Sequence, residues 1–387
     1  MKVKGFLKDI SGIFRVMKVR KKAIESANGE NIKEDKITKL AKELHPSKFK
    51  AVVSEIVEET KDAKRITFVS KQIPYFQAGN YLTVELEING SVVTRPYSIV
   101  SSPARAYKEK AIDIIVKDYK NGFVSSYLNH QLQIGDEVLL EVGLGNFNYV
   151  EYRDNKNIVA IAGGAGITPF LSMTHDIVER DLDINLTIIY GSDNPKQIIA
   201  KRELDMLAQD NIRVIHVISG NYPFNGEKGF ITGDIIKKYS PKECSYFICG
   251  PQAMKDLVLK ELAANRVDLR RIRVESFGIS DITKHPDFDK NLLDKEFEIE
   301  VHQGTFVSRI RALPNESIAV ALERSGLRIH TACRGGECGV CRVKVLSGTY
   351  FIPPENDHRR QTDKEYNYVH SCSTYPTSDL KIKINIA

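Results

Sequence analysis

Four cysteines near the C-terminus have the spacing of metal ligands. Cys333, Cys338 and Cys341 form a C-x4-C-x2-C pattern, and Cys372 follows further along the chain. Two irons bridged by two sulfides need four thiolates, and plant-type [2Fe–2S] centres use this spacing. Glycines inside the loop let backbone N–H groups approach the cluster sulfurs. A structural zinc site, which is the alternative, usually shows two C-x2-C pairs, so the sequence predicts that these cysteines hold a [2Fe–2S] cluster.

A glycine-rich turn in the middle of the chain has the composition of a phosphate-binding loop. It reads Gly163-Gly-Ala-Gly-Ile-Thr-Pro169, follows an apolar strand pattern and leads into an apolar-periodic helix. Glycines let the backbone approach a phosphate, and a helix N-terminus offers unpaired N–H groups. We expect Thr168 to cap this helix and Pro169 to be its first residue. Pro169 replaces the third glycine of a dinucleotide fingerprint, so an ordinary strand–helix turn remains the alternative.

Two stretches upstream combine residue types that can bind a nucleotide. Arg95-Pro-Tyr-Ser98 places a guanidinium, an aromatic ring and a hydroxyl close together, which suits pyrophosphate binding, ring stacking and hydrogen bonding to a heterocycle. Lys120-Asn-Gly-Phe-Val-Ser-Ser-Tyr127 begins a predicted helix whose N-terminus offers a second phosphate contact. Taken singly, each stretch is better explained as a barrel-end turn or a helix cap.

Changes in hydrophobic period indicate the elements that would position these residues. Period-two alternation with turns such as Asn89-Gly90 predicts an antiparallel barrel, and alternating strands and helices from Asn157 predict a parallel α/β sheet. Strand patterns and a helix from Ser317 to Gly326 predict a small α+β domain around the cysteines. The predicted domains are a basic helical extension at 1–47, the barrel at 48–152, the α/β domain at 153–280, a polar linker at 281–295 and the α+β domain at 296–387.

The composition is that of a globular multidomain protein, with 387 residues, 42% hydrophobic and 27% charged. No run of about 18 apolar residues and no secretory signal pattern is visible. Cys244 and Cys249 would lie about 16 Å apart on one strand, too far for a disulfide. Free thiols beside an iron–sulfur loop favour a reducing compartment, and we expect the cytoplasm.

The basic charge of the chain is concentrated at its N-terminus. The first 22 residues hold eight Lys or Arg and one Asp, a net +7, so the rest sums to −1 and gives no bulk signal for nucleic acid. Two helices are predicted there, the first with an apolar face that includes Phe6, Ile13 and Met17, the second running from Ile37 to Pro46. The first helix suits either the inner face of an anionic membrane or packing on a partner or on the body of the protein.

Together these motifs resemble the ferredoxin–NADP⁺ reductase superfamily. The matching motifs, in the family's order, are Arg95-x-Tyr97-Ser98, Gly122-x-x-Ser125, Gly163-Gly-x-Gly-Ile-Thr-Pro169, Cys249-Gly-Pro251 and Glu275-Ser-Phe277. With its C-terminal cysteines, the chain from about Phe49 to Ala387 is similar to fused reductases of the phenylacetyl-CoA and benzoate oxygenase type.

The resemblance implies a six-stranded flavin barrel, a Rossmann-like nicotinamide domain and a β-grasp ferredoxin domain. It implies catalytic roles for Ser98 near flavin N5, Cys249 near nicotinamide C4 and Glu275 on the flavin side. It implies FAD rather than FMN, because relatives that use FMN carry a different phosphate loop. The implied flavin contacts are Arg95, Pro96, Tyr97, Ser98, Gly122, Val124, Ser125, Ser126 and Phe277. The implied nicotinamide nucleotide contacts are Gly163, Gly164, Gly166, Ile167, Thr168, Pro169, Ser192, Asp193, Gly250 and Pro251.

The resemblance implies an NAD(P)H oxidoreductase that passes electrons through FAD and the cluster to a protein acceptor. Many relatives have Arg where Asp193 stands; Asp would repel a 2′-phosphate, so NADH is favoured, although Lys196 and Arg202 lie nearby in the sequence. The alternatives are a non-catalytic electron-transfer subunit, as in dihydroorotate dehydrogenase, and a membrane-docked module of a larger redox complex.

Overall fold

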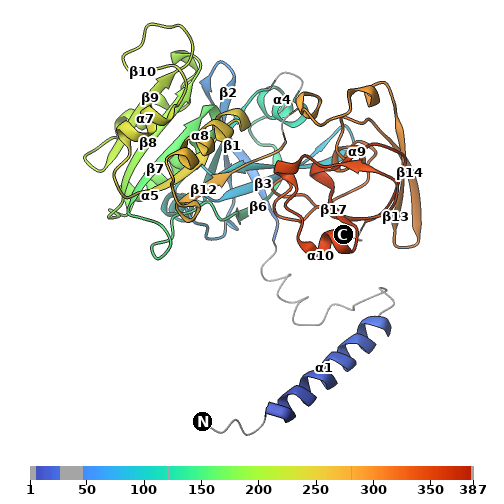
Figure 1. The fold of residues 1–387 in the computed structure, drawn as a ribbon. Helices are drawn as coiled ribbons and strands as arrows, with labels where there is room; N and C mark the ends of the chain where they lie inside the picture. The colour runs from blue at the N-terminus through green and yellow to red at the C-terminus, as the bar shows by residue number, and fades with distance from the viewer. Residues whose placement is uncertain (1–5, 27–46, 120–121, 280, 385–387) are drawn as a thin grey trace. The chain divides into compact units, whose positions relative to one another are not determined.

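The computed structural model describes residues 6–26, 47–119, 122–279 and 281–384 (Figure 1). The chain divides into two compact units, Met1–Ser47 and Lys48–Ala387. In the first unit, helix α1 (Phe6–Ser26) confirms the first predicted helix, and Ile13 and Met17 on its predicted apolar face are exposed. The second predicted N-terminal helix lies outside the described residues. Among the helices that the structure describes, none combines the length and the apolar character needed to cross a membrane.

The second unit begins with the predicted antiparallel barrel. Its six strands have the order β4-β3-β6-β1-β2-β5, and the Val100 N–H donates to the Asp113 carbonyl at 2.9 Å, which joins the end of β4 to β5. Asn89 and Gly90 both have positive φ (52° and 77°), as a primed hairpin turn requires. The elements are β1 (Phe49–Thr60), β2 (Ala63–Val69), β3 (Tyr81–Ile88), β4 (Ser91–Ser98), α3 (Pro103–Glu109), β5 (Ala111–Lys117), α4 (Phe123–His130) and β6 (Glu137–Leu144).

The next part is a six-stranded parallel sheet in the order β10-β9-β8-β7-β11-β12. Ile158 and Ala160 of β7 pack in the apolar core that includes α5 and α6, whereas Val159 and Ile161 pack with α7 and α8, so helices cover both faces. The strand order reverses beside β7, and such a switch point is where α/β sheets bind ligands. The elements are β7 (Asn157–Gly163), α5 (Thr168–Glu179), β8 (Asn185–Ser192), α6 (Lys201–Leu207), β9 (Ile212–Ile218), β10 (Glu227–Lys228), α7 (Gly233–Tyr239), β11 (Ser245–Cys249), α8 (Gln252–Ala264) and β12 (Ile272–Glu275).

The C-terminal part is an α+β domain with a mixed sheet in the order β14-β13-β19-β15-β17. Strand β13 pairs in parallel with β19, and Ser317 caps α9 as predicted, accepting a hydrogen bond from the Val320 N–H at 3.4 Å. Figure 1 shows this domain, orange to red, on one side of the barrel and the parallel sheet on the other. The elements are β13 (Phe297–Gln303), β14 (Phe306–Ala312), α9 (Ile318–Arg324), β15 (Arg342–Ser347), β16 (Tyr350–Phe351), α10 (Gln361–Glu365), β17 (Tyr368–His370), β18 (Tyr375–Pro376) and β19 (Leu380–Ile384).

The segment predicted as a linker is folded onto the C-terminal domain. It contains two short 3-10 turns, Ile282–Lys284 and Lys290–Leu292. Ile282 and Phe288 are buried in a small cluster with Tyr375. The polar composition hides these apolar anchors, because they are too few to give a helical or strand period.

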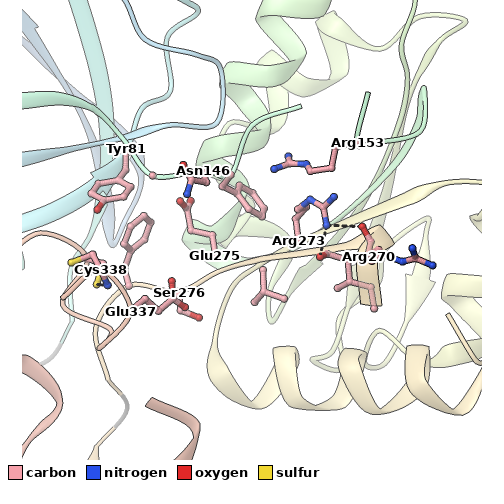
Figure 2. A pocket seen from close by; sticks show the side chains of 15 residues that line it. Tyr81, Asn146, Arg153, Arg270, Arg273, Glu275, Ser276, Glu337 and Cys338 are labelled. Atoms are coloured by element: carbon pink, nitrogen blue, oxygen red, sulfur yellow. Dashed lines mark hydrogen bonds between the residues drawn. The ribbon is translucent and has the colours of Figure 1, made fainter. Parts of the chain in front are cut away.

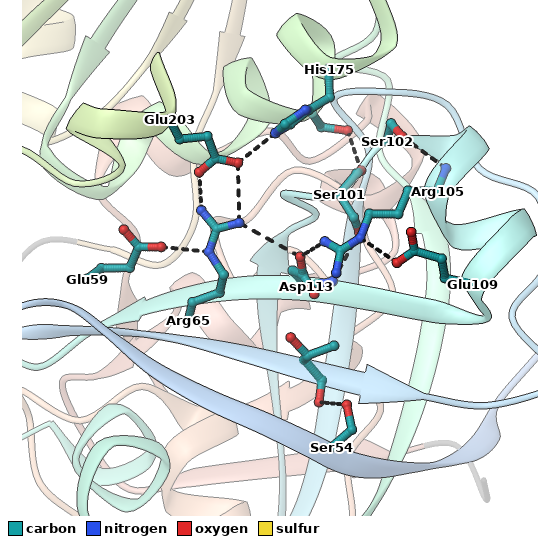
Figure 3. Close-up of polar contacts among 12 residues, drawn as sticks. Ser54, Glu59, Arg65, Ser101, Ser102, Arg105, Glu109, Asp113, His175 and Glu203 are labelled. Atoms are coloured by element: carbon teal, nitrogen blue, oxygen red, sulfur yellow. Dashed lines mark hydrogen bonds and ion pairs between the residues drawn. The ribbon is translucent and has the colours of Figure 1, made fainter. Parts of the chain in front are cut away.

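A network of charges fixes the barrel on the α/β domain (Figure 3). Arg65 on β2 contacts both carboxylate oxygens of Glu203 on α6, and His175 Nε2 on α5 lies 2.6 Å from Glu203 Oε1. Burial raises the pKa of Glu203, but the hydrogen bond with His175 and the charge of Arg65 outweigh burial and lower the pKa to about 2. The carboxylate therefore stays ionised at neutral pH, and it holds the two domains at a fixed relative position.

Candidate active site

The four predicted cluster ligands lie together as two pairs. The Cys333 and Cys338 thiols shift each other's pKa through direct contact, and so do the Cys341 and Cys372 thiols. Cys338 is exposed and the other three are buried. A [2Fe–2S] cluster takes two thiolates on each iron, so two pairs fit this group.

The backbone of the cysteine loop is shaped for sulfur ligands. The N–H groups of Gly335 and Cys338 each lie 3.4 Å from Cys333 Sγ and donate to it. Gly336 has a φ of +85°, and a Cβ at this position would lie 2.4 Å from the Asn356 carbonyl oxygen. Only glycine fits there, which explains why the loop is glycine-rich. Because N–H···S bonds stabilise thiolates, the donor set of the loop fits an iron–sulfur cluster.

The two predicted nucleotide motifs meet at the switch point of the parallel sheet. A Cβ on Gly166 would lie 2.1 Å from the Cys249 carbonyl oxygen, so a glycine lets the turn after β7 pack on the end of β11 and on Gly250. Gly164 has a φ of +53°, and nothing lies within 4 Å of the position of its Cβ, which leaves open space above the turn. Open space over a glycine turn suits a phosphate group.

The predicted start of the following helix is wrong. Thr168 is not the N-cap: a 3-10 turn, Gly164–Ile167, comes first, Ile167 occupies the cap position, and Thr168 is the first residue of α5. The Thr168 hydroxyl donates to the Ala165 carbonyl at 2.8 Å instead of capping. Ile167 and Pro169 are buried, so their side chains serve packing at the base of the turn. The other predicted nucleotide residues of this sheet lie at strand ends: Gly163 ends β7, Ser192 ends β8, Asp193 follows β8 on the surface, and Gly250 and Pro251 follow β11.

The three predicted catalytic residues are brought together from two domains. Cys249 and Glu275 are register partners on the adjacent parallel strands β11 and β12. The Ser98 hydroxyl, at the end of β4, donates to Glu275 Oε2 at 3.2 Å. Burial raises the pKa of Cys249, and the nearby Glu275 adds to this effect. Burial likewise raises the pKa of Glu275 well above its ordinary value, against the opposing hydrogen bond from Ser98.

The predicted flavin phosphate residues lie on β4 and α4. Gly122 is the N-cap of α4, and among the described residues no side chain accepts a hydrogen bond from the first N–H groups of this helix. A Cβ on Gly122 would lie 2.1 Å from Ser125 Oγ. Ser126 follows within α4, and Pro96 and Val124 are buried. Burial raises the pKa of the Tyr97 hydroxyl, and the nearby Tyr119 adds to this effect. A helix N-terminus without a side-chain cap fits a phosphate of a flavin nucleotide, and Arg95 supplies a positive charge on β4.

A cavity of about 810 Å³ lies beside Glu275 and the cysteine loop (Figure 2). Its wall includes Glu275 and Phe277 of the predicted flavin side and Cys333 and Cys338 of the cluster loop. The cavity therefore joins Glu275 of the predicted catalytic residues to two of the predicted cluster ligands. Sequence patterns do not identify three residues at or next to this cavity. The Tyr81 ring packs edge-on to Phe277 with ring centroids 5.1 Å apart, and Glu337 lies in the cavity wall. Lys255 is 4% exposed, and its Nζ contacts Oγ of the wall residue Ser276. No local pattern marks them, because each becomes significant only through a contact with a distant segment.

Comparison with known protein families agrees with this geometry. Residues 50–149 match the oxidoreductase FAD-binding domain family, residues 160–260 match the oxidoreductase NAD-binding domain family, and residues 302–377 match the 2Fe-2S iron-sulfur cluster binding domain family. The chain is an oxidoreductase with FAD-, NAD- and [2Fe–2S]-binding domains. These matches confirm the predicted fold and the resemblance to fused reductases.

Individual relatives match this oxidoreductase over most of both chains. It is 28% identical over 348 residues to the glycine betaine monooxygenase reductase subunit of Chromohalobacter salexigens, covering 85% of this chain and 93% of the relative. It is 27% identical over 348 residues to one of the subunits of the 1,2-phenylacetyl-CoA epoxidase of Escherichia coli, covering 85% of this chain and 96% of the relative. Its fold is similar to that of phthalate dioxygenase reductase, with a TM-score of 0.65 at 20% identity, covering 88% of this chain and 98% of that one.

Proposed function

We propose that the oxidoreductase takes electrons from NADH and passes them, through FAD and a [2Fe–2S] cluster, to a protein acceptor such as an oxygenase. The observation that carries this proposal is the cavity whose wall includes Glu275 and Phe277 together with the predicted ligands Cys333 and Cys338. Subunits of a monooxygenase and of an epoxidase among the relatives support the class of acceptor. In the overall reaction NADH becomes NAD⁺ and one proton is released, while two one-electron acceptors are reduced.

Each group of residues has a defined task in this proposal. When bound, FAD would link two-electron hydride chemistry to one-electron transfer, and the cluster would carry single electrons. Arg95 and the N-terminus of α4 would hold the flavin phosphates, and Tyr97 would lie against the ring system. The turn after β7 would hold the nucleotide pyrophosphate, while buried Cys249 excludes water beside the nicotinamide. The four cluster cysteines would ligate the two irons.

The Ser98–Glu275 pair would hold a proton beside the flavin. Glu275 has a raised pKa because of burial, so it favours the protonated form, and Ser98 donates to its Oε2. A buried carboxylic acid hydrogen-bonded to a hydroxyl can hold or release a proton without admitting bulk water.

Anaerobic titration of the purified protein with NADH, and separately with NADPH, tests the proposal. Flavin bleaching followed by a rhombic iron–sulfur signal in low-temperature EPR is the expected result with NADH. If flavin and cluster are present but neither nucleotide reduces them, the chain is instead an electron-transfer subunit that receives its electrons from a partner.

The preference for NADH is proposed from Asp193, which is exposed just beyond the carboxyl end of β8, where the ribose of a bound dinucleotide would lie. Asp193→Arg is expected to raise kcat/KM for NADPH relative to NADH by about tenfold or more, because it replaces a repelling carboxylate with a guanidinium that can pair with the 2′-phosphate. Steady-state rates with both nucleotides measure this ratio. Asp183→Arg is the matched control, since this exposed acid lies before the opposite end of β8 and pairs with Lys156. An unchanged ratio in Asp193→Arg would refute the assignment.

We further propose that α1 contacts a partner or an anionic membrane surface, as its exposed Ile13, Phe14 and Met17 and its neighbouring basic residues suggest. Removing residues 1–47 should abolish cosedimentation with anionic vesicles, since each basic residue near such a surface adds about 1 kcal/mol. NADH-dependent ferricyanide reduction should persist. If vesicle binding survives the deletion, the membrane contact is wrong.

A further inference from the structure

A buried carboxylate bridges the barrel and the C-terminal domain. Glu323 on α9 is only 4% exposed. Its Oε2 accepts a hydrogen bond from Arg95 Nη1 at 3.2 Å, and its Oε1 accepts one from Arg334 Nη1 at 2.6 Å. Arg95 lies on β4 of the barrel, whereas Arg334 belongs to the cysteine loop. One carboxylate is therefore shared between two arginines of different domains.

The charges of Arg95, Glu323 and Arg334 do not cancel, because two guanidinium groups face one carboxylate. Burial, together with the positive charge of Arg334, lowers the pKa of Arg95 to about 10. Among the described residues, the Arg95 guanidinium donates hydrogen bonds only from Nη1, and the acceptors are the Glu323 carboxylate and the Thr94 carbonyl. Its Nε and Nη2 groups are left for an anion, so Arg95 can contact Glu323 and a phosphate at once.

Both arginines adjoin the predicted redox sites. Arg95 opens the flavin motif on β4, and Arg334 directly follows the cluster ligand Cys333. On its other side, the cysteine loop lies against the segment after Glu275: the Gly278 N–H donates to the Cys333 carbonyl at 3.5 Å, and a Cβ on Gly335 would lie 3.2 Å from the Ser276 carbonyl oxygen. A shift of the C-terminal domain would therefore move the cluster away from the flavin side of the cavity.

We propose that Glu323 is a positioning residue that holds the cluster domain against the flavin site by sharing its carboxylate between Arg95 and Arg334. This inference rests on the proposed function, in which Arg95 holds the flavin phosphate. Without the carboxylate, two guanidinium groups would face each other in a buried interface, which favours separation of the two domains. Electron transfer then slows, because electron tunnelling weakens with distance.

Two other ion pairs provide comparisons. Arg328 pairs with Glu85 of β3 across the same interface, but Arg328 is 52% exposed, so this pair should contribute less. Glu316 pairs with Arg324 inside the C-terminal domain and does not cross the interface. Glu323→Gln, Arg328→Gln and Glu316→Gln thus form a graded series from a buried interdomain carboxylate to a pair within one domain.

The test uses the full chain loaded with FAD and cluster. Stopped-flow absorbance after mixing with NADH gives the rate of cluster reduction relative to that of flavin reduction. Glu323→Gln should lower this ratio by about tenfold or more, because truncating one partner of a buried charge pair weakens an interface by at least that factor. Hydrogen–deuterium exchange of residues 91–98 and 331–336, measured without NADH, should become faster. Arg328→Gln should show a smaller change, Glu316→Gln none, and Glu323→Asp, which keeps the charge, a partial return to the wild-type ratio.

Wild-type ratio and wild-type exchange in Glu323→Gln would overturn the proposal. If wild-type protein does not bind FAD or is not reduced by NADH, the proposed function fails instead, and the exchange data still report on the interface. If Glu323→Gln does not assemble its cluster, as judged by EPR after dithionite reduction, Glu323→Asp decides: an intermediate ratio supports the positioning role, and a wild-type ratio refutes it.

Discussion

Cys372→Ala is expected to abolish reduction of one-electron acceptors such as cytochrome c, while NADH still bleaches the flavin. Cys372 is buried beside Cys341 and is the one predicted ligand that comes from outside the loop. Its removal would leave one iron of the cluster with a single thiolate. Loss of a residue that only hydrogen-bonds to a metal ligand lowers metal affinity or activity by about 10–100-fold. Loss of a ligand itself should therefore lower the rate of acceptor reduction by more than about 100-fold.

Iron and sulfide content, the EPR spectrum after dithionite reduction, and cytochrome c reduction measure this result. Cys244→Ala is the matched control, because Cys244 is a buried free thiol that packs against α8 on the far side of the parallel sheet. It should keep the cluster and full acceptor reduction. A wild-type EPR signal in Cys372→Ala would contradict the assigned ligand set.

Glu275→Gln is expected to slow NADH-dependent flavin reduction while making the protein more stable at neutral pH. The amide keeps the shape of the side chain and cannot hold or release the proton, so the rate should fall by about 10²-fold, a typical contribution of a positioned acid or base. The free energy of unfolding should rise by about 1–2 kcal/mol, because the variant no longer buries a group that must bind a proton.

The pH dependence fixes the sign of the stability effect. Burial raises the folded-state pKa of Glu275 above the ordinary value of 4.5. Below pH 4.5 the side chain is protonated in both the folded and the unfolded chain, so its burial does not lower the free energy of unfolding there. As pH rises from 4.5 through the folded-state pKa, the unfolded chain releases the proton first, and stability is lost. Glu275→Gln and wild type should therefore be equally stable near pH 4, and should diverge as pH rises.

Thermal or denaturant unfolding between pH 4 and pH 8 measures this divergence, and stopped-flow flavin bleaching measures the rate. Glu137→Gln is the control: its carboxylate pairs with Lys50 on the exposed surface of the barrel. Its stability should stay within about 0.5 kcal/mol of wild type. Equal stability of Glu275→Gln and wild type at every pH would show that Glu275 is not held in its protonated form.

Local patterns in the sequence were sufficient for the regularly alternating strands and for the motifs, because these depend on neighbouring residues. The Asn89-Gly90 turn, the Ser317 cap and the cysteine loop each carry their signal within a few positions. Helix α3, which is not among the predicted helices, carries a signal of the same kind, because Ser102 caps it and Pro103 begins it. The cap predicted at Thr168 was wrong because a tight 3-10 turn takes up the chain before α5 begins.

The remaining parts depend on contacts between distant segments. Strand β12 has only four residues and little apolar pattern, yet it places Glu275 beside Cys249. Glu323 looks like a surface residue in an amphipathic helix, and only the docking of α9 on β4 buries it against Arg95. Lys255 likewise looks like an ordinary lysine on a helix, and only its contact with Ser276 distinguishes it. No periodicity in the sequence reports such pairings.

The packing of the connecting segment bears on how such enzymes are assembled from interchangeable parts. Ile282 and Phe288 are anchored on Tyr375, so residues 281–294 belong structurally to the C-terminal domain. Recombination that exchanged the cluster domain between reductases would therefore be least disruptive at Gly278, where the chain leaves the cavity. A break after residue 295 would instead separate the apolar anchors Ile282 and Phe288 from Tyr375 and leave them exposed. In this oxidoreductase, the natural unit of exchange is the cluster domain together with its connection.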